Sequence, residues 1–315
     1  MAVLLAYFSV VLIWATTPLT IQWSSDSLSF IAAVLLRMSF ALTVGLVINL
    51  VLRRKLFLLP NVWQVYAAGA IGIFPNMPVV YWSAQFIPSG LVAIVFAMSP
   101  FVTGLISAVL LKENPFSRRR VLALMLAMFG LSIIFYQQLH FNLRAAFGVI
   151  GILLSCFLFG FSSVLVKKLN VRVDAFNQAL GTLLFALPGL LITWWFLDGH
   201  IPLAISIKSL MAVSYLSIFG SLLGAALFFY VLANMSPISV SLITFMTPIL
   251  ALMLGALVAK ESLSLWVWMG AGLVVFALLL YLDLSATVLL FKALRSPKWQ
   301  DDGLQSIKDD YIRYK

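Results

Sequence analysis

The chain has 315 residues, of which 63% are apolar and only 10% are charged, and its mean hydropathy is +1.10. A water-exposed surface needs more charge than this, so the composition excludes a soluble domain and predicts a single-domain polytopic membrane protein. The net charge of +10 does not indicate a nucleic-acid partner, because the basic residues fall in short clusters between long apolar runs.

Ten apolar runs predict membrane-spanning helices, each of which needs about 20 apolar residues. In chain order they cover residues 2–22, 29–52, 62–84, 88–111, 120–138, 145–166, 174–197, 208–232, 238–259 and 265–283. The first run has no basic leader and is too long for a signal-peptide core, so we interpret it as a retained helix. The short connections predict that neighbouring helices are antiparallel.

The distribution of lysine and arginine predicts the orientation of these helices. The connections after even-numbered helices, together with the polar tail, hold 16 of these residues, whereas the connections after odd-numbered helices hold three. Positively charged connections stay on the cytoplasmic side. We therefore expect both termini in the cytoplasm.

Two stretches repeat the same landmarks 148 residues apart. The first runs from Met98-Ser99-Pro100 to Lys112-Glu113, and the second runs from Met246-Thr247-Pro248 to Lys260-Glu261. The predicted orientation places the first Lys-Glu pair in the cytoplasm and the second outside. An odd number of helices in each half makes the two halves inverted repeats, an arrangement found in secondary transporters with a substrate site between the halves.

The sequence therefore predicts an all-α integral membrane protein with ten transmembrane helices in two inverted five-helix repeats. The repeats cover residues 1–138 and 145–283, and residues 284–315 form a cytoplasmic polar tail. The lipid bilayer is one partner, and a monomer or a homodimer is compatible with the sequence.

The paired Pro…Lys-Glu landmarks resemble the EamA-type ten-helix exporters of the drug/metabolite transporter superfamily. Trp14 in the first helix and Arg37 in the second fit the same resemblance, which covers residues 1–283. It implies a central cavity lined chiefly by helices 1, 3, 4, 6, 8 and 9, and export of small metabolites, amino acids or amphipathic drugs by alternating access. The implied location is the cell membrane, most simply a bacterial inner membrane.

Polar and aromatic residues near predicted helix kinks are the candidate substrate-binding residues. They are Trp14, Arg37, Asn76, Tyr81, Trp82, Gln85, Ser99, Ser162, Tyr215, Tyr230, Asn234 and Thr247. Buried amides and hydroxyls in a membrane turn toward protein partners, and prolines kink helices where freed carbonyls find other donors. Pro75 and Pro78 on either side of Asn76 make the densest predicted break.

Several candidates also have a structural interpretation. Arg37, the one charged residue well inside a span, would attract an anionic group such as a substrate carboxylate, or would reach the outer interface or cap helix carbonyls. Tyr81, Trp82 and Tyr230 would also fit an aromatic belt at the membrane interface. Glu113 and Glu261 would either couple transport to ions or simply stabilise helix ends.

Catalytic, metal and cofactor sites are not predicted. The single cysteine, Cys156, is interpreted as a packed small hydrophobe, and His140 and His200 are isolated from carboxylates. The alternatives are uptake or exchange by the same fold, a subunit of a larger membrane complex, and a lipid-acting membrane enzyme that would use Glu113 beside the basic residues 118–120.

Overall fold

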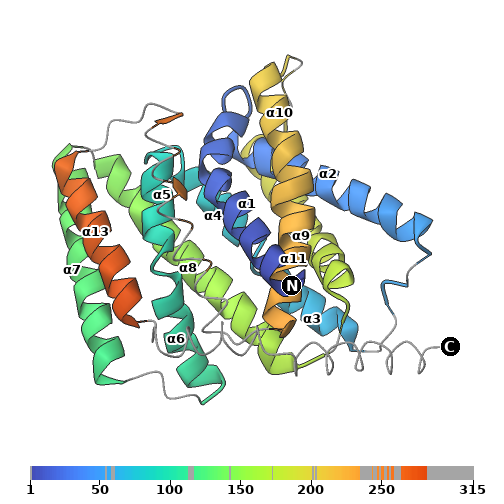
Figure 1. The fold of residues 1–315 in the computed structure, drawn as a ribbon. Coiled ribbons are helices and arrows are strands. Elements are labelled where there is room, and N and C mark those ends of the chain that lie inside the picture. Colours follow the sequence, from blue (N-terminus) through green and yellow to red (C-terminus); the bar gives the residue numbers. More distant parts are fainter. Residues whose placement is uncertain are drawn as a thin grey trace.

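The computed structural model describes a helical bundle (Figure 1). The described residues are 2–53, 55–57, 61–112, 117–141, 143–171, 173–200, 202, 204–234, 243, 247, 250–251, 254, 257–258 and 264–281. Within these ranges there is no β-strand, and six helical segments are long and apolar enough to cross a membrane. The predicted span 238–259, apart from isolated positions, and the tail lie outside the described residues.

The helices follow the predicted runs. They are α1 (Ala2–Ser24), α2 (Phe30–Val51), α3 (Val62–Ala70), α4 (Asn76–Ser83), α5 (Ser89–Phe96), α6 (Ser99–Leu110), α7 (Arg118–Phe141), α8 (Leu143–Leu169), α9 (Ala175–Leu197), α10 (Ile207–Tyr215), the π-helix η1 (Leu216–Leu223), α11 (Gly224–Asn234) and α13 (Leu265–Tyr281).

Side-chain caps explain where three of these helices begin. The oxygens of Ser29, Asp174 and Ser206 accept hydrogen bonds from backbone N–H groups at the starts of α2, α9 and α10. Such caps satisfy donors that have no partner inside the helix. The apolar sequence sets the helix lengths, and these caps set the starting residues.

Three predicted spans depart from a regular helix. The span 62–84 is divided into α3 and α4 by turns at residues 71–75, and the span 88–111 into α5 and α6 by Ala97 and Met98. Pro100 stands in the first turn of α6, where its missing N–H removes no helical hydrogen bond. The span 208–232 is continuous but contains η1, so its irregularity comes from π-helical geometry.

The two halves of the chain interleave. The divided helix α3–α4 packs against α8 and α9, whereas the path α10–η1–α11 packs against α1 and α2. In addition, α2 contacts α9, and α7 lies beside α13 at one edge of the bundle (Figure 1). Helices from one half therefore form the immediate neighbours of helices from the other.

Large apolar side chains cover much of the outer surface. Leu12, Val109, Trp195 and Phe196 are each more than 60% exposed. This surface suits contact with lipid tails, which satisfy no polar group but accept apolar side chains freely.

Candidate functional site: a cavity between the two halves

An internal cavity of about 190 Å³ lies where the irregular helices meet. Residues from α1, α2, α3, α4, α5, α6, α8, α9, η1 and α11 line it, together with Thr247 and with Gly72 in the turns between α3 and α4. The family resemblance implied that the first, third, fourth, sixth, eighth and ninth spans line the cavity, and each of these spans contributes described residues. The second and seventh spans, α2 and α9, contribute as well. Among the described lining residues, Arg37 is the one charged side chain.

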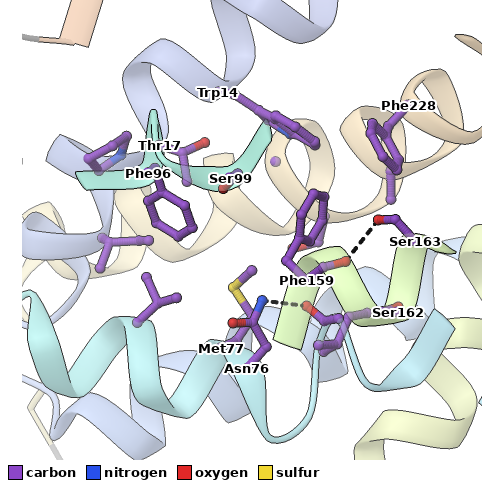
Figure 2. Close-up of a pocket in the computed structure, with 18 of the residues that line it drawn as sticks. Trp14, Thr17, Asn76, Met77, Phe96, Ser99, Phe159, Ser162, Ser163 and Phe228 are labelled. Atoms are coloured by element: carbon purple, nitrogen blue, oxygen red, sulfur yellow. Dashed lines mark hydrogen bonds between the residues drawn. The ribbon is translucent and has the colours of Figure 1, made fainter. Parts of the chain in front are cut away.

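Three aromatic rings from separate helices form one wall of the cavity. Trp14 of α1 lies 5.1 Å from Phe228 of α11 and 5.9 Å from Phe159 of α8, measured between ring centroids, and the two phenylalanines are 5.6 Å apart. Figure 2 shows the three rings gathered together, with Asn76 and Met77 reaching in from the divided helix. Such a wall offers an apolar, polarizable surface to a ligand.

The break between α3 and α4 is held by hydrogen bonds from side chains. Ser162 of α8 donates to the carbonyls of Ala68 at 2.7 Å and Gly69 at 3.1 Å, and the amide nitrogen of Asn76 donates to the carbonyl of Gly72 at 2.9 Å. These are carbonyls that a continuous helix would satisfy itself. Side-chain hydrogen bonds therefore stabilise the interruption of the helix at the cavity wall.

Neighbouring helices fix the same break from outside. Gln178 of α9 donates to the carbonyl of Val65 at 3.0 Å and to the hydroxyl of Thr182 at 3.3 Å. Thr182 also lines the cavity. A side chain on Gly69 would bring its Cβ within 2.3 Å of the Thr182 hydroxyl, so only glycine permits this close approach.

Arg37 enters the cavity from α2 with its side chain 3% exposed. Its Nε donates to the hydroxyl of Ser221 in η1 at 2.7 Å, and its Nη1 donates to the hydroxyl of Tyr81 at 3.3 Å. Gly220 makes room for the guanidinium, because a Cβ there would lie 3.1 Å from Nη2. The interpretation that Arg37 reaches the outer interface is therefore wrong.

Tyr81 separates the cavity from a second hollow. It is fully buried and bonded to Arg37, and it also lines a depression formed with Gln22, Ser25, Leu28, Ser29, Phe30, Ala84 and Gln85. The interfacial-belt interpretation is wrong for Tyr81. The hydrogen-bonded pair Arg37 and Tyr81 thus forms a partition between the cavity and the hollow beside the loop that joins α1 to α2.

Polar loops tie the two halves together beyond this partition. Ser206 donates from its backbone N–H to the Ser27 hydroxyl at 2.9 Å, and the Ser27 N–H donates to the Ser209 hydroxyl at 3.1 Å. An ion pair of 3.2 Å joins Lys208 to Asp26. These contacts join the loop between α1 and α2 to the start of α10, and we call residues 26–29 with 206–209 the loop clasp.

The structure brings six of the twelve candidate residues to the cavity: Trp14, Arg37, Asn76, Ser99, Ser162 and Thr247. Tyr81 and Gln85 line the second hollow, and Tyr215 bonds instead to the hydroxyl of Thr16 at 2.7 Å. Trp82 packs on Phe86, Tyr230 packs against the cluster around Val10 and Phe228, and Asn234 is exposed.

Sequence reasoning missed several lining residues, above all Phe159, Phe228, Phe96 and Thr182. In an apolar span, the sequence does not reveal which phenylalanines face inward. The 148-residue repeat offered one signal, because it aligns Val80 with Phe228 and both line the cavity. Cys156 is buried, as its interpretation as a packed residue predicted.

A bundle of membrane-crossing helices around an internal cavity defines a multi-pass cell membrane transport protein. The chain belongs to the EamA-like transporter family, whose sequence model matches residues 1–136 and again 146–282.

Its relatives align with it along most of the chain. Protein PecM of Dickeya dadantii is 27% identical over 275 residues, which are 87% of this chain and 90% of that protein. The uncharacterized inner membrane transporter YedA of Escherichia coli K12 is 26% identical over 288 residues, covering 87% of this chain and 89% of its own. A crystal structure at 17% identity has the same fold, with a TM-score of 0.62 over 94% of this chain and 99% of the other.

Proposed function

We propose that this protein is a secondary transporter that exports small metabolites, amino-acid-like or amphipathic, from the cytoplasm by alternating access. In this proposal the chain forms ten transmembrane helices in two inverted five-helix repeats with both termini in the cytoplasm. The observation that carries it is the cavity at the interface of the halves, where transporters built from inverted repeats hold their substrate.

The packing of the helices supports a two-fold relation between the halves. Exchanging each helix with its counterpart five spans away turns the contacts of α3–α4 with α8 and α9 into those of α10–α11 with α1 and α2. The contacts between α2 and α9 and between α7 and α13 are each their own counterparts. These contacts exchange with one another as an inverted repeat requires, whereas the contact between α7 and α8 has no described counterpart between α13 and α1.

The irregular segments are the proposed gates. The turns at residues 71–75 and the π-helix η1 both border the cavity, and an offset of 148 residues brings Gly72 onto Gly220. Interrupted helices absorb the backbone changes that opening and closing need, and π-helical segments often mark functional positions. Each half therefore supplies one irregular element at the same place in the repeat.

The loop clasp bears on direction. The positive-inside rule places residues 26–29 and 206–209 outside. The hydrogen bonds of the clasp and the Arg37–Tyr81 pair lie on this side of the cavity, so in our proposal substrate enters the cavity from the cytoplasmic side. This loading favours export; uptake or exchange would need the same cavity to load in the opposite conformation.

The test is transport by the purified full-length chain. Liposomes are loaded with a metabolite extract, and mass spectrometry follows the compounds that leave. Protein-dependent release of a defined subset is expected, and an Ala225→Trp variant, which fills the cavity, should release none of it. Equal release from loaded liposomes with and without the protein would overturn the proposal.

A further inference from the structure

We infer that the cavity selects organic anions, and that Arg37 binds the anionic group while the aromatic wall holds an apolar body. This inference rests on the proposed transport function and narrows its substrate from amino-acid-like or amphipathic metabolites to amphipathic anions without an ammonium group. Three observations carry it: Arg37 has N–H donors that no described residue accepts, no described carboxylate lies beside it, and the rest of the described cavity lining is largely apolar.

The guanidinium keeps donors available for a ligand. Arginine has five N–H groups in a planar fork. Ser221 accepts the Nε hydrogen and Tyr81 accepts one on Nη1. Both N–H groups on Nη2 lack a partner among the described residues, and Gly220 leaves space beside them. This is the arrangement that binds a carboxylate with two parallel hydrogen bonds.

The positive charge of Arg37 is not neutralised by the protein that the structure describes. No carboxylate of the described residues lies within ion-pair distance of it, and the described cavity lining includes no acidic residue. The sequence between residues 235 and 260, which includes the lining residue Thr247, also contains no Asp or Glu. A buried cation in a membrane usually has a partner, so a bound anion would stabilise this one.

The rest of the cavity favours an apolar ligand body and disfavours an ammonium group. Beyond the rings of Trp14, Phe159 and Phe228, the wall includes Phe96 and Ile21. A ligand amine would find no carboxylate there among the described residues, and the carbonyls exposed by the helix break already accept hydrogen bonds from Ser162 and Asn76. An aromatic or branched monoanion therefore fits better than its amide, and far better than its amine.

The experiment compares three ligands with one shared body: 3-phenylpropionate, 3-phenylpropanamide and 3-phenylpropylamine. Isothermal titration calorimetry gives the Kd of each for the purified full-length chain in detergent. We expect the anion to bind about tenfold more tightly than the amide, since one charged hydrogen-bonded pair is worth at least this factor in a buried site.

Matched variants assign the preference to its residue. Arg37→Gln should abolish the preference for the anion and leave amide binding within a factor of about three, whereas Arg37→Lys should keep part of it because the charge remains. Lys167→Gln removes an exposed cation outside the cavity and should change nothing.

Each other outcome is decisive. Amide binding equal to or tighter than anion binding would overturn the inference, even if Arg37→Gln did not fold. An anion preference that survives in a folded Arg37→Gln protein would also overturn it. The same holds if none of the three ligands binds to a preparation that transports metabolites. Liposomes that release no metabolite at all would instead overturn the proposed function itself.

Discussion

Ser155 of α8 donates its hydroxyl to the side-chain oxygen of Asn76 at 2.5 Å, and neither side chain is exposed. Asn76 in turn donates to the carbonyl of Gly72. One buried amide thus connects a helix of the second half to the interrupted helix of the first. The connection explains how a break between two prolines can be held in one conformation at the cavity wall.

Replacing Asn76 by leucine should destabilise the protein by about 1–3 kcal/mol, because the Gly72 carbonyl and the Ser155 hydroxyl would lose their buried partner. The apparent melting temperature in detergent measures the loss. Adding Ser155→Ala removes one of the two orphaned groups and should recover part of it. Ser132→Ala, which removes an exposed hydroxyl, is the control; an equal effect there would show that the buried bonds are not the cause.

The close approach of α3 to α9 should make Gly69→Ala destabilising by about 1–3 kcal/mol, since its Cβ would lie 2.3 Å from the Thr182 hydroxyl. The same melting assay applies. Combining the change with Thr182→Ala removes the clash and should restore most of the stability. Gly272→Ala on α13 meets nothing within 4 Å and should be neutral. A double variant no better than Gly69→Ala would contradict the packing argument.

A bulky side chain in the cavity should stop transport without unfolding the bundle. Ala225→Trp adds an indole to the cavity lining, and we expect release from liposomes to fall by about tenfold or more because the ligand space is filled. Ala233→Trp places the same ring on an exposed position of α11 and should retain normal activity. Normal transport by folded Ala225→Trp protein would show that substrate does not pass through this cavity.

Locking the loop clasp should arrest alternating access. Cys156 is the single cysteine of the chain, so a Cys156→Ala background lets a Ser27→Cys/Ser209→Cys pair be oxidised selectively. The Ser27 N–H lies 3.1 Å from the Ser209 hydroxyl, which places the two residues close enough to try a disulfide. Oxidation should stop transport, and reduction should restore it.

The single-cysteine variants control for the substitutions themselves. Full transport by the cross-linked protein, verified by mass spectrometry, would mean that these loops need not separate during the cycle.

The ion pair between Asp26 and Lys208 is partly exposed, so its removal alone should change stability by less than about 1 kcal/mol.

The sequence was informative where a residue type has one dominant structural effect. Prolines at 75 and 78 predicted the interruption of the third span, and the structure places turns at residues 71–75. Long apolar runs predicted the spans, because the bilayer core imposes a length. The count of ten helices stays a prediction, since most of residues 238–259 lie outside the described part of the chain.

What the sequence could not predict depends on helix rotation and on side-chain partners. Nothing in Leu216–Leu223 except Gly220 distinguishes a π-helix from an ordinary one. Tyr215 was expected at the substrate site but bonds to Thr16, because a rotation about the helix axis decides which neighbour it meets. The burial of Arg37 likewise required knowing that Ser221 and Tyr81 converge on it.

The two halves interrupt their equivalent helices by different chemical means, and this has an energetic consequence. Pro75 lacks the N–H that a regular helix would need, so the break in the first half cannot become a fully hydrogen-bonded helix. The π-helix of the second half is built from residues that can all donate, so it can return to α-helical geometry. In the proposed transport cycle, the two gates would therefore differ in the backbone hydrogen bonds they can gain, and the inward-facing and outward-facing states of the empty protein would differ in free energy.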